Sequence, residues 1–245
     1  MRTRGSASEQ TRAALHRVGD RLRAQISDFV LPQQCLVCGS FGASLHLECL
    51  AALPTADGTR CTRCWRPTRT TWCERCAEDG SDAPAFDGLR TPFRFEGHAR
   101  RAILEAKFRG ITAHLPVLAG AAVDVIPPEW RFDAVVAVPL APLRQRRRGY
   151  NQAGILAREV ARLTGRGERT RLVARVRSTP AQATLSAERR ATNLLGAFAV
   201  RGAPPPSVLV VDDVTTTGST LSTIAAVLRA AGAERVYALA MARED

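Results

Sequence analysis

The sequence predicts an α/β protein whose mostly parallel sheet is flanked by helices and preceded by a small cysteine-rich segment and an N-terminal helix. From Phe86 onward, short apolar runs alternate with stretches whose apolar residues recur at helical spacing. This alternation is typical of parallel sheets covered by helices. All seven cysteines precede that point. We therefore expect a tail and helix over 1–30, a cysteine-rich segment over 31–85 and an α/β domain over 86–245.

The N-terminal stretch carries a helical pattern. Apolar residues recur every three or four positions between 11 and 30, and Pro32 ends the pattern. The sequence has no apolar h-region of a signal peptide and no apolar run of membrane-spanning length. An odd number of cysteines without export features also argues against a disulfide framework. We expect a helix that docks on the protein, a cytoplasmic location and no membrane span.

The cysteine-rich segment contains four ligand pairs, three of the form C-x-x-C and one of the form H-x-x-C. Such a turn lets two side chains reach one tetrahedral metal ion, and a second pair completes the shell. Eight ligands fit two structural zinc ions (Zn²⁺) with closed shells. Sequence order favours one site of Cys35, Cys38, His46 and Cys49 and another of Cys61, Cys64, Cys73 and Cys76, although a cross-braced pairing stays open.

The α/β domain divides into short strands and longer helices. Helices are expected where apolar residues follow a period near 3.6, and strands where short apolar runs are bounded by turn residues. The expected strands are 91–95, 134–138, 172–176, 198–200, 208–211 and 236–241, and the expected helices are 98–108, 115–125, 152–163, 187–195 and 221–231.

One stretch organises the domain: 208–220, which reads VLVVDDVTTTGST. Four aliphatic residues predict a strand buried on both faces. Two carboxylates follow it, and then a hydroxyl-rich loop leads into a helix that Ser219 or Thr220 can cap. Free N–H groups at a helix start favour a phosphate, whereas paired carboxylates suit a sugar diol and Mg²⁺ held through water. We expect a ribose-phosphate site of Asp212, Asp213, Thr215, Thr216, Thr217, Gly218 and Ser219.

An apolar strand followed by acids is also typical of the Walker B segment of nucleotidases. Such a protein needs a G-x-x-x-x-G-K-[ST] loop. The only lysine is Lys107, which Glu105 and Ala106 precede. The sequence therefore excludes this class.

A second segment with candidate site residues follows the strand expected over 134–138. Val138, Pro139 and Leu140 end that strand, and a basic loop over 143–152 comes next. Ligands gather at the carboxyl ends of parallel strands, so this segment and Asp212 can share one crevice. A charge run is commonly a solvated face. Opposite a phosphate loop, however, Arg144 or Arg148 can stabilise a pyrophosphate leaving group.

The stretch over 208–220 resembles the phosphoribosyl-pyrophosphate (PRPP) loop of type I phosphoribosyltransferases. The whole set of motifs, from about Leu31 to the C-terminus, resembles the ComF family, apart from His46, which stands where that family often has cysteine. The motifs are the cysteine pairs, Val138-Pro139-Leu140, Arg148-Gly149-Tyr150-Asn151-Gln152, Gln182-Ala183-Thr184-Leu185, Arg190-Ala191-Thr192-Asn193 and Asp212-Asp213-Val214-Thr215-Thr216-Thr217-Gly218.

The resemblance implies a type I phosphoribosyltransferase fold that binds PRPP with Mg²⁺, and a role in bacterial competence, the handling of incoming single-stranded DNA. Asp212 and Asp213 would bind the ribose hydroxyls, Thr215 to Ser219 the 5′-phosphate, and Val138 to Leu140 the pyrophosphate. The acceptor is not implied, and no residue of the sequence stands out as its general base.

Composition keeps further functions open. The formal net charge is +12 and the isoelectric point about 10.7, which favours polyanions such as nucleic acid or polyphosphate. A non-enzymatic module that binds PRPP or single-stranded DNA and acts through partners of the DNA-uptake machinery is one alternative. A ligand-sensing regulator is another, although no helix-turn-helix pattern accompanies it.

Overall fold

The computed structural model describes residues 33–77, 83–176 and 196–245. The helices expected over 11–30 and 187–195, and the motifs over 182–185 and 190–193, lie outside these residues. The chain divides into two compact units, Met1–Cys49 and Leu50–Asp245. Each unit is described by itself.

In the first unit, the described residues form a compact turn. A bridge between Gln34 and Phe41 closes it, and the Cys35 N–H donates to the Ser40 carbonyl at 2.8 Å. The short helix α2 (Leu47–Ala51) begins in this unit and contains Cys49.

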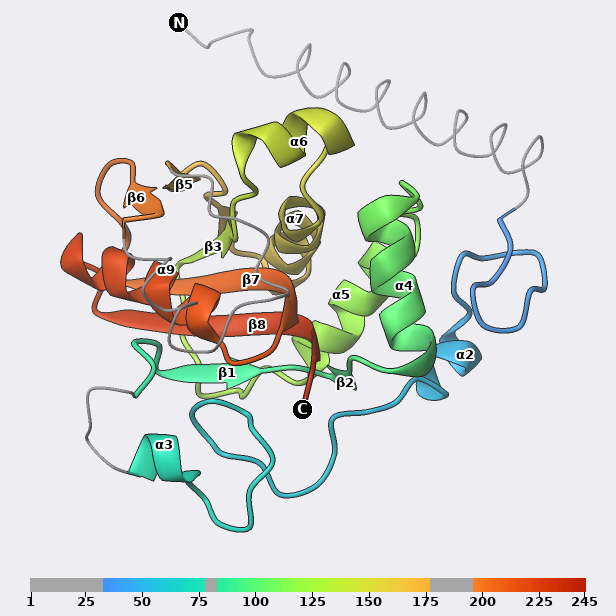
Figure 1. The fold of residues 1–245 in the computed structure, drawn as a ribbon, viewed down its shortest axis with the longest axis horizontal. Helices are drawn as coiled ribbons and strands as arrows, with labels where there is room; N and C mark the ends of the chain where they lie inside the picture. The colour runs from blue at the N-terminus through green and yellow to red at the C-terminus, as the bar shows by residue number, and fades with distance from the viewer. Residues whose placement is uncertain (1–32, 78–82, 177–195) are drawn as a thin grey trace, which may run out of the picture. The chain divides into compact units, whose positions relative to one another are not determined.

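The second unit is built on a six-stranded sheet whose strand pairs are all parallel. The strand order is β1-β8-β7-β3-β4, and β2 also pairs with β8. Figure 1 shows β7 and β8 side by side, with β1 next to β8. The mostly parallel sheet flanked by helices is thus confirmed. The strands are β1 (Gly88–Arg90), β2 (Phe93–Arg94), β3 (Ala134–Ala137), β4 (Gly167–Glu168), β7 (Ser207–Thr215) and β8 (Arg235–Arg243).

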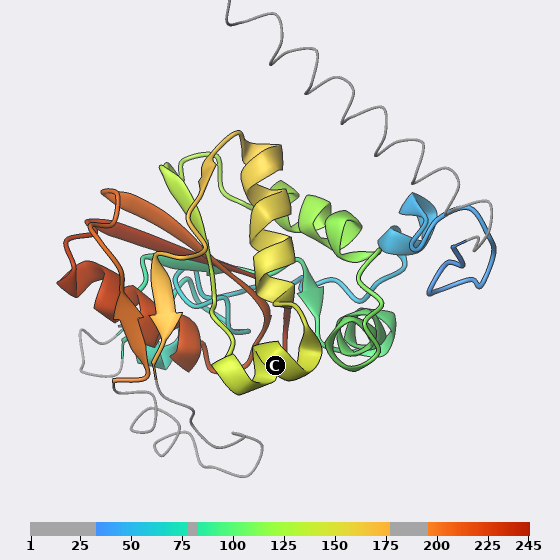
Figure 2. The same cartoon turned by 90° about the horizontal axis from the view of Figure 1, so that it is seen from above.

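Helices cover both faces of this sheet. The chain steps from β7 to β8 in one direction across the sheet and from β3 to β4 in the other. Because parallel crossovers are right-handed, the connecting helices α9 (Ser219–Ala230) and α7 (Gln152–Thr164) lie on opposite faces, as Figure 2 shows. Helix α5 (Leu115–Asp124) packs beside α7. The remaining described helices of this unit are α3 (Glu74–Ala77), α4 (Gly97–Phe108) and α6 (Pro142–Arg148).

The core lies between the central strands and these helices. Val208 to Val211 of β7 are completely buried, as expected for a strand covered on both faces. Leu221, Ile224 and Leu228 of α9 follow helical spacing and are also buried. A separate antiparallel pair, β5 (Val173–Arg175) and β6 (Phe198–Val200), stands apart from the main sheet.

Two boundaries of the stretch over 208–220 differ from expectation. Strand β7 continues through Asp212 and Asp213 to Thr215, because the nine-residue β8 offers partners along its whole length. The acids therefore lie within a strand rather than in a loop after it. Helix α9 begins after Gly218, whose φ is +77°, and neither Ser219 nor Thr220 caps it.

The basic stretch is a helix rather than a loop. Helix α6 begins at Pro142, and Gly149 ends it in the left-handed conformation with φ of +82°. Arginine is a good helix former, and proline at the start with glycine at the end is the usual arrangement. The expected strand over 91–95 is likewise replaced by the two short strands β1 and β2.

Candidate functional site

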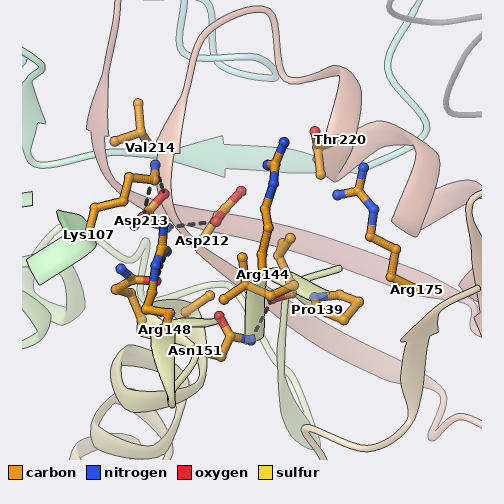
Figure 3. A pocket seen from close by; sticks show the side chains of 14 residues that line it. Lys107, Pro139, Arg144, Arg148, Asn151, Arg175, Asp212, Asp213, Val214 and Thr220 are labelled. Carbon is orange, nitrogen blue, oxygen red and sulfur yellow. Dashed lines mark hydrogen bonds and ion pairs between the residues drawn. The ribbon is translucent and has the colours of Figure 1, made fainter. Parts of the chain in front are cut away.

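The order of the strands creates a switch point between β7 and β3. The chain leaves β7 toward one edge of the sheet and β3 toward the other, which opens a crevice at their carboxyl ends. A cavity of about 200 Å³ lies there (Figure 3). It brings together both segments that were expected to share one crevice. Its lining residues are Lys107, Val138, Pro139, Leu140, Arg144, Arg148, Asn151, Gln152, Ala153, Arg175, Asp212, Asp213, Val214 and Thr220.

The two acids differ in their surroundings. Asp213 is buried and forms an ion pair with Lys107, with 3.2 Å between Oδ2 and Nζ. Asp212 accepts a hydrogen bond from the Asp213 N–H at 2.8 Å. Burial, followed by repulsion from the Asp213 carboxylate, raises the pKa of Asp212 to about 7. The negative charge of Asp213 is therefore balanced by Lys107. The charged form of Asp212 is unfavourable unless a hydrogen-bond donor or a cation of a ligand stabilises it.

The Arg-Gly-Tyr-Asn-Gln motif connects the end of β3 to the end of α4. The Asn151 amide donates to the Val138 carbonyl at 2.9 Å, and the Gln152 amide donates to the Ala106 carbonyl at 2.9 Å. The Tyr150 hydroxyl donates to the same carbonyl. These bonds fix the last turn of α4, which carries Lys107, against the mouth of the crevice.

The arginines of the site occupy two positions. Arg148 lines the cavity while its Nη1 donates to the Gln152 side chain at 2.6 Å. Arg144 and Arg175 extend toward the side of the cavity where Thr220 lies (Figure 3). Burial, followed by the positive charge of Arg144, lowers the pKa of Arg175. Cations that repel one another in this way favour an anionic ligand between them.

The hydroxyl-rich turn forms an adjoining hollow. A second cavity, of about 210 Å³, is lined by Lys107, Asp212 and the run from Val214 to Leu221. The Thr217 and Ser219 hydroxyls contact each other, and the Ser219 N–H faces Thr217 Oγ1 at 3.3 Å. Because the turn leads directly into the twelve-residue helix α9, its N–H groups form a site suited to phosphate.

Sequence reasoning missed several lining residues, among them Lys107, Asn151 and Arg175. Lys107 has a sequence signal, because it is the only lysine in an arginine-rich chain. Arg175 has none, since it reaches the cavity only through the β5–β6 pair. Asn151 was read as part of a motif and not as a residue of the site.

The eight expected metal ligands gather in two groups of four, in sequence order and not cross-braced. Within each group the ligand atoms all lie within 4.8 Å of one another. Tetrahedral zinc with sulfur at about 2.3 Å places neighbouring ligands about 3.8 Å apart, so both groups fit structural zinc. The groups are Cys35, Cys38, His46 and Cys49, and Cys61, Cys64, Cys73 and Cys76.

All four cysteines of the second group are buried, and Cys64 Sγ lies 3.5 Å from Cys73 Sγ. Burial opposes ionisation of Cys61, but N–H groups of Cys64, Cys73 and Arg63 outweigh it and lower its pKa to about 6. In the first group, Cys38 Sγ lies 3.4 Å from His46 Nδ1, so the histidine faces the thiols. Thiolate and imidazole ligands in closed sets of four are typical of structural zinc.

In the part of the chain that the structure describes, no helix combines the length and the apolar character needed to cross a membrane.

No family model matches the chain. It is 41% identical to competence protein F of Haemophilus influenzae over 115 residues. The matched region covers 45% of this chain and 50% of that protein. It is 39% identical over 115 residues to DNA utilization protein YhgH of Salmonella typhimurium (45% and 49% covered) and 38% identical over 112 residues to that of Escherichia coli K12 (45% and 49%). The chain spans about half the length of these curated relatives.

Proposed function

The chain is a relative of the ComF competence proteins, and on that premise we propose that it takes part in the use of incoming DNA and binds a phosphorylated ribose in its crevice. The names of its relatives, competence protein F and DNA utilization protein, support the first part. The chemistry of the crevice supports the second.

The observation that carries the proposal is the position of the two acids beside the hydroxyl-rich turn. Asp212 lines both cavities, one toward the arginines and one toward Thr215 to Ser219. A ribose 5-phosphate would place its ring hydroxyls against the carboxylates and its phosphate in the turn. Carboxylates accept hydrogen bonds from adjacent hydroxyls, and helix N-termini bind phosphate.

The arginines favour a second anionic group on the same ligand. The main cavity is lined by four cationic side chains, Lys107, Arg144, Arg148 and Arg175, and by two acids. With Asp213 paired to Lys107, positive charge prevails on the side of Arg144 and Arg175. A pyrophosphate on C1 of the ribose, as in PRPP, would lie there, and Mg²⁺ would be held through water by Asp212 and the ligand.

If the protein is an enzyme, it transfers the phosphoribosyl group. A nucleophile forms a bond to C1 of the ribose while the C1–O bond to pyrophosphate breaks, and the electron pair leaves with the pyrophosphate. Arg144 and Arg148 would stabilise that departing charge, and the carboxylates would hold the sugar in place.

Titration calorimetry with PRPP and Mg²⁺ tests the proposal. We expect saturable binding to a single site, competition by ribose 5-phosphate and by inorganic pyrophosphate, and loss of binding in Arg144→Ala together with Asp212→Asn. Absence of binding by the zinc-loaded wild type would contradict it. Release of pyrophosphate, measured with and without added bases, amines and single-stranded DNA, separates a transferase from a binding protein.

A second candidate is a non-enzymatic module that contacts single-stranded DNA. The net charge of +12 favours it. Binding through phosphate contacts should weaken steeply between 50 and 200 mM salt, in the range typical of counterion release. Because only 5% of residues are aromatic, few bases can stack and the affinity should be modest. Binding that is insensitive to salt would contradict this electrostatic contact, and no binding at low salt would assign the DNA contact to a partner.

A further inference from the structure

The second cysteine cluster, which consists of Cys61, Cys64, Cys73 and Cys76, contacts the hydroxyl-rich turn through an arginine. This turn, Thr215 to Ser219, is called the phosphate turn below. Arg75 lies in α3 between Cys73 and Cys76. Its Nη1 donates a hydrogen bond to the Thr217 carbonyl at 2.8 Å, across 142 positions of sequence. Thr217 is in the middle of the turn that leads into α9. An arginine between two metal ligands thus holds the backbone of the proposed phosphate site.

The geometry of the peptide unit makes this contact directional. A trans peptide is planar, with its C=O and N–H groups pointing to opposite sides. The Thr217 carbonyl and the Gly218 N–H belong to the same peptide unit. When Arg75 holds that carbonyl, the Gly218 N–H points away from the Arg75 guanidinium, and Gly218 is one of the residues that line the turn's hollow.

A second arginine of the cluster supports the same turn from behind. Arg63 lies between Cys61 and Cys64, and its guanidinium donates to the carbonyls of Phe86 and Pro84 at 3.2 and 2.7 Å. The completely buried Phe86 ring lies against Gly218, where an added Cβ would be 3.5 Å from it. Next to Phe86, the Ala85 N–H donates to Ser222 Oγ of α9 at 3.0 Å.

A third contact joins the cluster to the strand that precedes the turn. The buried Arg243 of β8 donates to the Cys64 carbonyl at 3.0 Å. The adjacent Glu244 N–H donates to the Thr215 carbonyl at 2.9 Å. The turn is therefore contacted from the cluster's side at three residues. Arg75 bonds to Thr217 directly, Arg63 bonds to Phe86, whose ring lies against Gly218, and Arg243, bonded to Cys64, precedes Glu244, which bonds to Thr215.

We propose that Arg75 is a positioning residue for the phosphate turn, and that occupancy of the Cys61, Cys64, Cys73 and Cys76 metal centre thereby sets the affinity for the phosphate end of the ligand. This rests on the proposed function, in which the turn binds a 5′-phosphate. The short α3 has only four residues, too few to be stable by itself. The metal at Cys73 and Cys76 fixes it, and Arg75 with it.

The test compares Arg75→Ala and Arg75→Lys with Arg69→Ala, an exposed arginine of the same cysteine-rich segment. Zinc content is measured first and should stay at the wild-type value in all three. Ribose 5-phosphate should then bind about tenfold more weakly to Arg75→Ala, the loss expected for one charged hydrogen bond. Inorganic pyrophosphate, which the arginines on the other side would bind, should keep its affinity. Arg75→Lys should recover part of the loss, and Arg69→Ala should match the wild type.

Amide hydrogen exchange separates this inference from the proposed function. In the protein without ligand, Arg75→Ala should speed exchange in residues 216–219 while the strands keep their protection. If the wild type does not bind ribose 5-phosphate, the proposed function fails, and faster exchange still supports the positioning role. If exchange and ribose 5-phosphate affinity are both unchanged in a zinc-loaded Arg75→Ala protein, the inference is overturned. Should that variant not fold, Arg75→Lys is judged by the same two outcomes.

Discussion

Lys107 Nζ lies 3.2 Å from Asp213 Oδ2, so the chain's only lysine pairs with the second of its two adjacent site acids. The contact joins the last turn of α4 to β7, 106 positions apart. It gives the neighbouring acids different roles. Asp213 is held as a paired carboxylate, whereas Asp212 has a pKa raised to about 7 and is the acid that a ligand would stabilise in its ionised form.

Removing the lysine should destabilise the fold through the charge left behind. The Asp213 side chain is only 12% exposed, so Lys107→Met leaves a largely buried carboxylate without its partner. We expect the free energy of unfolding at pH 8 to fall by about 1–3 kcal/mol, less than for a fully buried pair because Lys107 is partly exposed. Urea denaturation measures it. The double variant Lys107→Met, Asp213→Asn should regain most of the loss; if it is no more stable than the single variant, the ion pair is not the cause.

The raised pKa of Asp212 predicts a pH dependence of stability. Burial and then Asp213 raise this pKa from 3.8 to about 7, so between these values the folded protein binds more protons than the unfolded chain. The stabilising contribution is fully present below about pH 4 and is lost as pH rises through 7. Relative to Asp212→Asn, the wild type should therefore become less stable from pH 5 to pH 8. Parallel urea midpoints for the two proteins at both pH values check this, and a constant difference between them would contradict the raised pKa.

The two cysteine clusters should each hold one zinc ion, so the purified protein should contain close to two equivalents by elemental analysis. Cys73→Ser and Cys38→Ser should each lower the content toward one, because a closed shell loses a ligand. Metal binding in such segments is coupled to folding. Cys73→Ser should also weaken ribose 5-phosphate binding, whereas Cys38→Ser, in the other compact unit, should not. No zinc in the wild type, or disulfides by intact mass, would overturn the assignment.

The arginines across the crevice should act on the pyrophosphate end. Arg144→Ala should weaken inorganic pyrophosphate binding more than ribose 5-phosphate binding, since Arg144 lines the main cavity with Arg175 and is not among the residues that line the hollow of the hydroxyl-rich turn. Arg148→Ala should have a smaller direct effect, because its Nη1 is already bonded to Gln152. Calorimetric titrations with the two ligands measure both. Equal losses for both ligands in Arg144→Ala would contradict the assignment.

Much of this arrangement follows from local sequence. Val208 to Val211 predict a buried strand, and the spacing of Leu221, Ile224 and Leu228 predicts the helix after it, because burial on one or two faces leaves a direct pattern. The end of β7 could not be read in this way. Three of the four residues from Asp212 to Thr215 are polar, and pairing with the long strand β8 keeps this stretch in the ladder.

The site was predictable to the extent that it lies on one segment of chain. Asp212, Asp213 and the hydroxyl-rich turn are contiguous, and the end of β3 follows from the rule for parallel sheets. Lys107 and Arg175 come from α4 and from the β5–β6 pair, whose approach depends on tertiary packing. No spacing in the sequence encodes that approach.

The central claim is that Asp212, Asp213 and the turn from Thr215 to Ser219 bind a phosphorylated ribose. Its most direct test is calorimetric titration of PRPP with Mg²⁺ into the wild type and into Asp212→Asn, Asp213→Asn. Asparagine keeps the size of the two side chains, removes their charge and replaces one acceptor oxygen of each with an NH2 donor. We predict saturable binding by the wild type and at least a hundredfold loss, on the order of 3 kcal/mol, in a folded, zinc-loaded double variant. Equal affinity of the two proteins would contradict the account.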